Sequence, residues 1–256
     1  MDNTAILSRA RQVLDIEIEG LRSAQAALGD DFLATVRLVL DTLENGGKIV
    51  VTGVGKNLHI AEKLSATLAS TGSTSVVMNP IQAMHGDLGM IADQDVLLAL
   101  SFSGESDEVI KLIPAVRRLG IRVIGMVGNP DSTLARLSDT VLCVCIGQEA
   151  CPFGMAPTTS TTATLAVGDA LAMVLIEARH FNKERYARLH PAGAIGRALV
   201  LRVRDIMRTG EHMARVALSA TVMDGIMAMT TAKSGAALVA HADGRLAGIF
   251  TDGDLR

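Results

Sequence analysis

The first three quarters of the chain alternate short apolar runs with helix-like patterns, and this alternation restricts the fold more than any other feature. The runs are continuously apolar and rich in Val, Ile and Leu, as strands are when helices cover both faces of a parallel sheet. Residues 1 to about 200 are therefore expected to form one three-layer α/β/α domain with a mostly parallel sheet of about five strands. The expected strands are residues 48–54, 74–78, 95–100, 121–127 and 140–146.

Between these runs, apolar residues repeat with helical spacing. Two helices are expected before the first strand, and Asn45-Gly46-Gly47 is expected to end the second of them. The expected helices are residues 4–28, 32–43, 58–70, 106–119, 132–137 and 161–181.

The pattern changes after Leu201. Residues 203–256 are expected to supply a first strand, a short helix at 222–229 and two further strands at 236–240 and 245–250. A piece of this size buries little surface by itself. We therefore expect a second, separate unit that is marginal on its own.

The composition argues against nucleic-acid and membrane binding. Lys and Arg number 24 against 27 Asp and Glu, and there is no Trp and one Tyr, so clustered basic and stacking side chains are lacking. Thr, Pro, Ser and Gly fill the uncharged stretch 150–168, which predicts no membrane span. The N-terminus has no signal-peptide pattern, and Cys143, Cys145 and Cys151 are too few and too close for a disulfide framework. These features favour a cytoplasmic protein.

The expected strand at 95–100 leads directly into Ser101-Phe102-Ser103-Gly104-Glu105-Ser106, and a helical pattern follows. The first-turn N–H groups of a helix lack helical partners and favour anions. Ser101, Ser103 and Ser106 add hydroxyl donors, while Gly104 allows close backbone approach, so the stretch predicts a site for a phosphate monoester. The alternative is that Ser103 or Ser106 merely caps the helix.

Three other stretches carry polar groups of possible functional use. Gly53-Val54-Gly55-Lys56-Asn57 matches neither a P-loop nor a dinucleotide fingerprint, so a plain turn with a surface lysine is the alternative. Glu149 precedes the run Thr158-Thr159-Ser160-Thr161-Thr162, which holds more hydroxyls than helix capping requires. His190, in Leu189-His190-Pro191-Ala192-Gly193, has a structural role as its alternative.

Long segments of the sequence resemble the sugar isomerase (SIS) domain family and, within it, the arabinose 5-phosphate isomerases. The resemblance spans residues 1 to about 200 and is carried by "VTGVGKNLHIAEKLSATLASTGS", "AMHGDLGM", "SFSGESDEVIKLIP", "EACPFGMAPTTSTTATLAVGDALA" and "LHPAGAIGRAL". In addition, "VRDIM" and "GRLAGIFTDGDLR" resemble parts of a CBS module. The resemblance thus implies an SIS domain at 1–200 and an incomplete first CBS module at 203–256.

This resemblance implies an aldose–ketose isomerase that interconverts D-ribulose 5-phosphate and D-arabinose 5-phosphate through an enediol. It also implies a homotetramer with sites shared between subunits and a role in supplying Kdo, a lipopolysaccharide sugar. We expect no cofactor. Two alternatives stay open: a regulatory protein that only binds a sugar phosphate, and an isomerase of another sugar phosphate.

By the same resemblance, Lys56, Glu108, Glu149 and His190 match the catalytic positions of the family, and either glutamate is a candidate base. Their retention favours an enzyme over a sensor. Each glutamate also has an ordinary explanation, since an acid in a first helical turn stabilises the helix dipole and an acid in a loop is usually just solvated. The implied substrate-binding set is Gly72, Ser73, His85, Ser101, Ser103 and Ser106.

One stretch departs from the family pattern. Relatives typically carry a His at the position of Asn79 and an acid near Gln82, and that His is associated with zinc. Asn and Gln are weak zinc ligands beside imidazole, thiolate or carboxylate. We therefore expect no metal site.

Overall fold

The structure, a computed structural model, describes residues 2–190 and 202–255. The chain divides into two units, residues 1–197 and 198–256. Each unit is described by itself.

A five-stranded sheet forms the centre of the first unit, with strand order β2-β1-β3-β4-β5 and every pairing parallel. All residues of the two central strands β1 and β3 are buried, which explains why their sequences are continuously apolar. The predicted parallel sheet is confirmed. Its strands are β1 (Ile49–Gly53), β2 (Ser75–Val77), β3 (Val96–Leu100), β4 (Arg122–Val127) and β5 (Thr140–Cys143).

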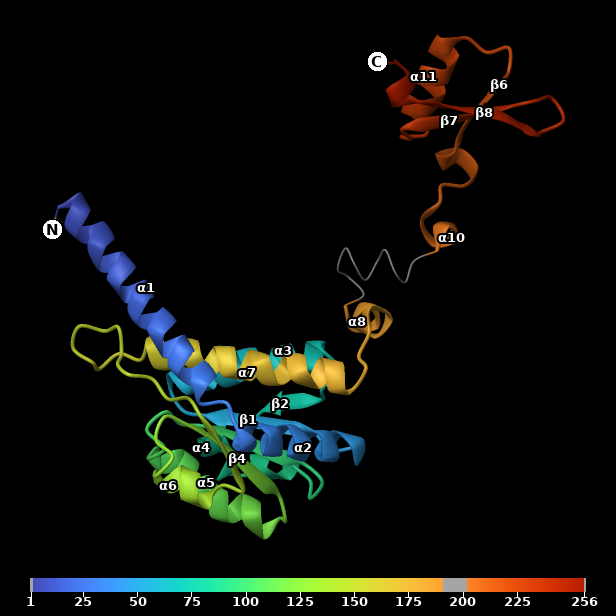
Figure 1. Ribbon diagram of the computed structural model, residues 1–256. Coiled ribbons are helices and arrows are strands. Elements are labelled where there is room, and N and C mark those ends of the chain that lie inside the picture. The colour runs from blue at the N-terminus through green and yellow to red at the C-terminus, as the bar shows by residue number, and fades with distance from the viewer. Residues whose placement is uncertain (1, 191–201, 256) are drawn as a thin grey trace. The chain divides into compact units, whose positions relative to one another are not determined.

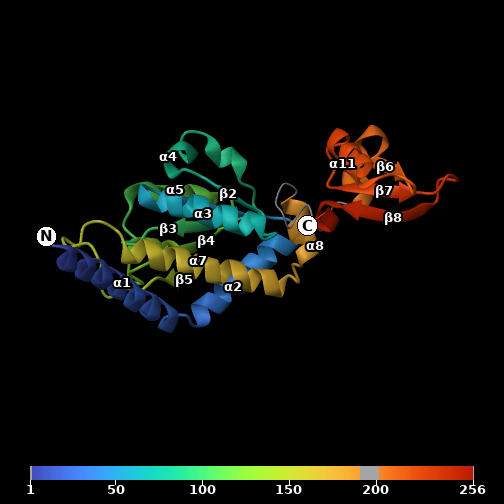
Figure 2. The same cartoon turned by 90° about the horizontal axis from the view of Figure 1, so that it is seen from above.

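Helices cover both faces of this sheet, with α3 and α7 on one side and α5 and α6 on the other (Figure 1). The first layer comprises α1 (Asn3–Ala26), α2 (Asp30–Glu44), α3 (Lys56–Ser70) and α7 (Thr159–Ala178). The second comprises α4 (Pro80–Ala83), the 3₁₀ turn η1 (Asp87–Met90), α5 (Asp107–Arg118) and α6 (Thr133–Leu137). Helix α8 (Lys183–Leu189) follows α7. In both ribbon views the N-terminal half of α1 extends past the sheet (Figure 2).

Side chains that alternate along the central strands fill two separate cores. Leu98 of β3 packs into the core that contains Leu64 of α3 and Leu171 of α7, whereas its neighbour Leu97 packs with Leu112 of α5. Because successive residues of a strand point to opposite faces, one apolar run supplies both cores.

The carboxyl ends of β1 and β3 lie side by side, since Gly53 pairs with Leu100 at the end of both strands. The helix after β1 packs on one face of the sheet and the helix after β3 on the other. Connections that diverge in this way leave a crevice beyond the strand ends, where doubly wound α/β folds bind ligands. The fold therefore places the candidate site between the loops that follow Gly53 and Leu100.

Helix α7 is long and apolar enough to cross a membrane, and 50% of that stretch is buried inside the unit. Its residues Val167, Leu171 and Leu175 contact the sheet-side core. The core helix of a globular protein has the same properties, so length and composition here give only weak evidence of a span.

The second unit contains a three-stranded sheet in which β6 pairs with β7 in parallel and β7 with β8 in antiparallel fashion. Helix α11 packs on it through Met229, against Ala237 and Phe250. Residues 203–206 form the short helix α10, and the first strand begins at Ala214. The elements are α10 (Val203–Ile206), η2 (Gly210–His212), β6 (Ala214–Ala217), α11 (Val222–Thr231), β7 (Ala236–Ala240), β8 (Leu246–Thr251) and η3 (Asp252–Leu255). Its assignment to an incomplete CBS module stays a prediction.

A buried ion pair joins the amino ends of β1 and β3. Asp95 is 3% exposed, and its carboxylate accepts bonds from the Lys48 backbone N (2.9 Å), the Lys48 Nζ (2.5 Å) and the Ala92 N (2.8 Å). Burial raises the pKa of Asp95, but the hydrogen bonds from Lys48 and Ala92 outweigh burial and hold this pKa below its usual value. Asp95 thus fixes the register at which the two central strands begin.

We expect Asp95→Asn to lower the free energy of unfolding by about 3 kcal/mol at pH 7, because it leaves the Lys48 ammonium without its partner. Urea denaturation measures this loss. The pKa of Asp95 is depressed in the folded state, so its contribution is present above the unfolded pKa of about 3.9 and disappears as pH falls through the folded value. The matched control is Asp169→Asn, which breaks the exposed Lys63–Asp169 pair and should change stability by about 0.5 kcal/mol or less. Equal losses in the two variants would contradict the assignment.

Candidate active site

The loop after β3 is held in one conformation by its own hydroxyl groups. The Ser101 and Ser106 Oγ atoms lie 2.8 Å apart, and the Glu105 N donates to the Ser103 Oγ (3.2 Å). Ser106 is the N-cap residue of α5, yet its side chain makes no capping bond to the first turn. The sequence left open that Ser103 or Ser106 only caps the helix. Neither side chain makes a capping bond to the first turn of α5, so this alternative is not supported. The N–H groups at the start of α5 therefore have no side-chain cap.

Gly104 lets this loop pack against the loop that follows β4. Its φ of +68° lies in the left-handed region, and a Cβ on it would come within 2.0 Å of the Ser132 Oγ. Two backbone bonds join the same loops, from Leu134 N to Gly104 O (3.0 Å) and from Gly128 N to Phe102 O (2.8 Å). The Ser101–Ser106 loop is thus shaped in advance by protein contacts.

Lys56 begins α3 on the other side of the crevice. Gly55, with φ +58° and ψ −127°, makes the sharp turn from β1 into the helix. The Lys56 side chain is exposed and makes no ion pair with any described residue. Because Gly53 is paired with Leu100, Lys56 and Ser101 each follow closely on the ends of adjacent strands. A cation and an open helix N-terminus are thereby brought to the same edge of the sheet.

Glu108 lies in the first turn of α5 and is exposed. Its neighbour Asp107 pairs with Lys111 (3.0 Å), whereas the Glu108 carboxylate has no ion pair within the described part of the chain. Glu108 therefore lies next to the Ser101–Ser106 loop with its carboxylate unengaged.

Glu149 accepts hydrogen bonds at the N-terminus of α7. Its Oε2 accepts from the Thr158 N (2.8 Å), the Thr158 Oγ1 (2.9 Å) and the Ser160 N (3.2 Å). Burial raises the pKa of Glu149, but the Ser160 hydroxyl nearby and the bonds from Thr158 and Ser160 lower it more, so the pKa lies below its usual value. Glu149 is consequently a carboxylate at neutral pH. The sequence pointed to the hydroxyl run but did not identify Thr158 and Ser160 as partners of Glu149.

The remaining predicted residues fall into two places. His85 follows α4, which comes after the carboxyl end of β2, and its ring is exposed. Gly72 and Ser73 precede β2 at the opposite edge of the sheet, where Arg179 bonds to the Gly72 carbonyl and, at 3.3 Å, to the Ser73 Oγ. The structure therefore does not bring Gly72 and Ser73 together with Ser101–Ser106 within one subunit.

His190 ends α8. Its Nδ1 lies 2.9 Å from the Tyr186 O, and its ring stacks on that of Tyr186 with centroids 3.9 Å apart. These contacts orient the ring and leave the Nε2 without a partner among residues 2–190 and 202–255. The rest of the "LHPAGAIGRAL" stretch after His190 lies outside the described residues.

Asn79 caps α4. Its Oδ1 accepts from the Ile81 N (2.9 Å) and, more weakly, from the Gln82 N (3.5 Å). Within residues 2–190 and 202–255, no three His, Cys, Asp or Glu side chains lie close enough to hold a metal ion. The Asn79 side-chain oxygen therefore has a structural role as the cap of α4.

Cys143 and Cys145 form a disulfide, against the sequence expectation. Strand β5 ends at Cys143, earlier than the expected 140–146, and the Cα atoms of Cys143 and Cys145 are 5.5 Å apart. This distance is within the range of ordinary disulfides, so the short spacing does not prevent pairing. Cys151 is a free thiol.

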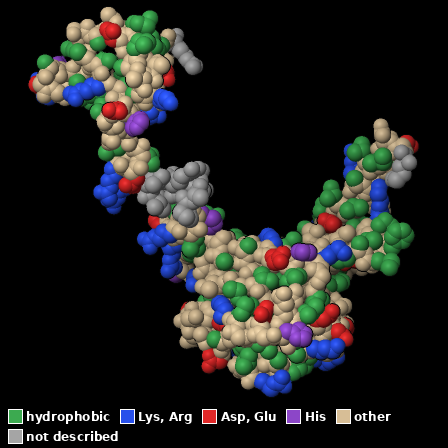
Figure 3. All heavy atoms as spheres, turned by 180° about the vertical axis from the view of Figure 1, so that it is seen from behind, with side chains coloured by type: hydrophobic (Ala, Val, Ile, Leu, Met, Phe, Trp, Pro, Cys, Tyr) green, Lys and Arg blue, Asp and Glu red, His purple; other side chains and the backbone are tan. Residues whose placement is uncertain are grey.

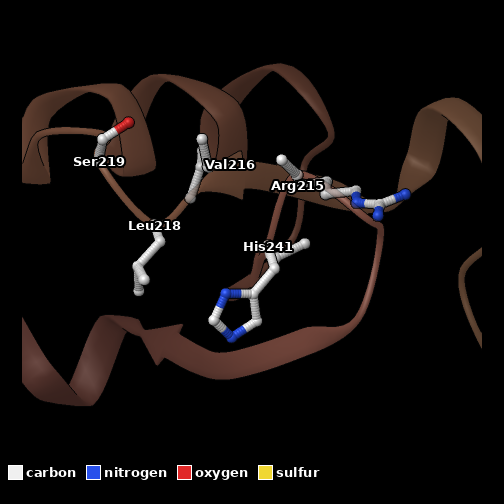
Figure 4. A pocket seen from close by; sticks show the side chains of 8 residues that line it. Arg215, Val216, Leu218, Ser219 and His241 are labelled. Atoms are coloured by element: carbon white, nitrogen blue, oxygen red, sulfur yellow. The ribbon is translucent and has the colours of Figure 1, made fainter.

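A cavity of 690 Å³ lies in the second unit, at the ends of β6 and β7. Leu218 and His241 lie side by side there, whereas the Arg215 guanidinium points away and bonds to the Gly244 O (Figure 4). None of the predicted site residues lines it.

Comparison with known proteins supplies the family. Residues 42–174 match the SIS domain family. The chain is 46% identical to arabinose 5-phosphate isomerase KdsD of Pseudomonas aeruginosa over 99% of its own length and 77% of the relative. It is 45% identical to KdsD of Escherichia coli over 96% of its length and 74% of the relative. A solved Escherichia coli protein in complex with A5P superposes with a TM-score of 0.71 and 33% identity, covering 75% of this chain and 100% of that one. The chain therefore belongs to the SIS-domain family and, within it, to the arabinose 5-phosphate isomerases.

Proposed function

We propose that this protein interconverts D-ribulose 5-phosphate and D-arabinose 5-phosphate and that its product supplies the synthesis of Kdo. The observation that carries the proposal is the open N-terminus of α5, where the Ser106 side chain makes no capping bond and Glu108 follows within the first turn. The start of α5 thus combines the proposed phosphate site with the carboxylate of Glu108. The relationship to arabinose 5-phosphate isomerases indicates a sugar phosphate as the substrate.

The phosphate is proposed to bind at Ser101–Ser106. The positive end of the α5 dipole and its unpartnered N–H groups favour a dianion. The Ser103 hydroxyl and one hydroxyl of the Ser101–Ser106 pair can turn their protons toward phosphate oxygens, while the other member of the pair donates within it. Binding of this remote group holds the sugar carbons in place for reaction.

The reaction moves one proton between carbon 1 and carbon 2. A carboxylate base removes the proton from carbon 2 of the aldose, and the C–H electron pair forms the enediolate. A proton then reaches the former carbonyl oxygen and gives the enediol. Return of the proton to carbon 1, with loss of the hydroxyl proton at carbon 2, gives the ketose. We assign Lys56 to charge stabilisation of the enediolate or to the phosphate, and His190 to proton transfer between the oxygens or to ring opening. The base is Glu149 or Glu108.

An assay on a panel of pentose and hexose phosphates tests the function. Conversion of D-ribulose 5-phosphate well above that of the other sugars supports the proposal. Binding of sugar phosphates without turnover would identify a sensor, and preferred turnover of another sugar would identify an isomerase of that sugar.

We expect Glu149→Gln and Glu108→Gln each to reduce kcat by about 100-fold or more if the residue is the base, since this is a common loss for a general base. Binding of the phosphosugar should be weakened much less. Asp107→Asn, which removes an acid paired with Lys111 in the same helical turn, is the control and should retain activity. If both glutamine variants turn over at the wild-type rate, the base assignment is wrong.

The double variant Ser101→Ala and Ser103→Ala should mainly raise KM for the phosphorylated sugar. Each hydrogen bond to a charged group contributes about 1.5–3 kcal/mol, so the loss should reach tenfold or more. Steady-state kinetics measures it. Ser75→Ala, which removes a part-buried bond to the Ser65 Oγ at the amino end of β2, controls for general damage. An unchanged KM in the double variant would assign the serines to structure alone.

We further propose a tetramer in which subunits share active sites. Exposed apolar side chains lie along α1, at Ile6 (50% exposed), Leu7 (56%), Leu14 (59%) and Ile18 (46%), and Figure 3 shows apolar side chains over this helix. A second copy would cover them. Sharing could also bring Gly72 and Ser73, which lie at the opposite edge of the sheet from the Ser101–Ser106 loop of their own subunit, to the loop of a neighbour.

Mixing two inactive variants tests this sharing. If His190 serves the site of a neighbour, co-folding Glu149→Gln with His190→Asn chains restores some fully native sites, and activity should reappear. Each variant alone, refolded in the same way, is the control. Failure of the mixture to regain any activity, while both variants assemble normally, would place His190 in the site of its own chain.

We propose a cytoplasmic location, where the Cys143–Cys145 pair would be held reduced. The proposal includes no metal and no cofactor. The absence of a metal is supported by Asn79, which stands where relatives carry the zinc-associated His and whose side-chain oxygen caps α4 instead.

A further inference from the structure

The Glu149 carboxylate is bound asymmetrically. All three donors at the start of α7, the Thr158 N, the Thr158 Oγ1 and the Ser160 N, reach Oε2, at 2.8, 2.9 and 3.2 Å. Within the described residues, Oε1 receives no hydrogen bond. One carboxylate oxygen is thus anchored in the helix N-terminus, and the other is left for a different partner.

Thr158 connects this carboxylate to the loop that carries it. Its Oγ1 donates to Glu149 Oε2 and accepts from the Ala150 N (2.9 Å). Thr159 Oγ1 accepts from the same Ala150 N (3.1 Å), so the loop keeps one anchor when the Thr158 hydroxyl is removed. A mutation that removes the Thr158 hydroxyl can therefore weaken the stabilisation of the Glu149 charge while the Thr159 bond keeps the loop in place.

Ser160 provides a second, unexplained group at this helix N-terminus. Its side chain is 1% exposed, and its Oγ has no hydrogen-bond partner. A buried hydroxyl without a partner is costly. A small shift of the neighbouring carboxylate would satisfy it, so Ser160 is a reserve donor for Glu149.

We propose that Thr158 and Ser160 are positioning residues that hold Glu149 as a carboxylate and present its Oε1 to the substrate as the proton acceptor. This inference rests on the proposed isomerase function and resolves its open choice of base in favour of Glu149. The C–H proton passes to Oε1, and the C–H electron pair passes into the enediolate. Oε2 stays bound to α7, and Oε1, once its proton has exchanged with solvent, delivers a proton to the adjacent carbon.

The test compares Thr158→Val with wild type in two measurements. The first is the pKa of Glu149, followed by ¹³C NMR of the labelled carboxyl carbons and assigned with Glu149→Gln. Removing a donor to the charged form should raise this pKa by about one unit. The second is the pH profile of kcat/KM, in which the acid limb should move up by the same amount, because only the carboxylate accepts the proton. At neutral pH Glu149 stays ionised, so kcat and KM should stay close to the wild-type values there, and the loss of rate should appear on the acid limb.

Two further variants separate positioning from structure. Thr158→Ser keeps the hydroxyl and should restore both the pKa and the rate. Thr161→Val removes a hydroxyl that bonds to the Thr158 O in the same helical turn and does not touch Glu149, so the pKa should stay at its wild-type value. Ser160→Ala in the Thr158→Val background should raise the pKa further.

The failures are distinguishable. If the pKa of Glu149 and the acid limb stay fixed in Thr158→Val while the wild-type enzyme is active, the positioning role is wrong and the isomerase stands. If the pKa moves but wild-type protein exchanges no proton at carbon 2, the proposed function is wrong and with it the role of Oε1.

Discussion

The parallel pairing of β1 with β3 is the constraint on which the site depends. Gly53 and Leu100 end the two strands side by side, and the connections then leave toward opposite faces of the sheet. That divergence places the beginnings of α3 and α5 on either side of the two strand ends, where folds of this kind bind ligands. At the other end of the same strands, Asp95 and Lys48 set where the pairing starts. The register of two strands therefore determines where Lys56 and the Ser101–Ser106 loop lie.

Two helix N-termini at the carboxyl edge are used in different ways. The start of α5 has no side-chain cap, whereas the start of α7 is occupied by the protein's own Glu149. Unpartnered N–H groups and the helix dipole favour negative charge at both places. The proposed phosphate and the Glu149 carboxylate would thus each be compensated by its own helix.

Sequence reasoning predicted the sheet and its layers because continuous apolar strands are a strong signal. It also located the Ser101–Ser106 loop, since the hydroxyls and glycine follow directly on a strand. It did not identify the pairing of Glu149 with Thr158, because that contact depends on how an irregular loop returns to its helix. The disulfide between Cys143 and Cys145 was not expected either, as the composition of the chain carries no information on local pairing. The short helices α4 and α8 have too few residues for periodicity to reveal them.

The most direct test of the central claim is the exchange of the carbon 2 proton in D₂O during reaction of D-arabinose 5-phosphate. Wild-type protein should form D-ribulose 5-phosphate with deuterium entering the sugar, and Glu149→Gln should abolish both the exchange and the product. Product formed at the wild-type rate by Glu149→Gln, or binding of the sugar by wild-type protein without any exchange, would contradict the account.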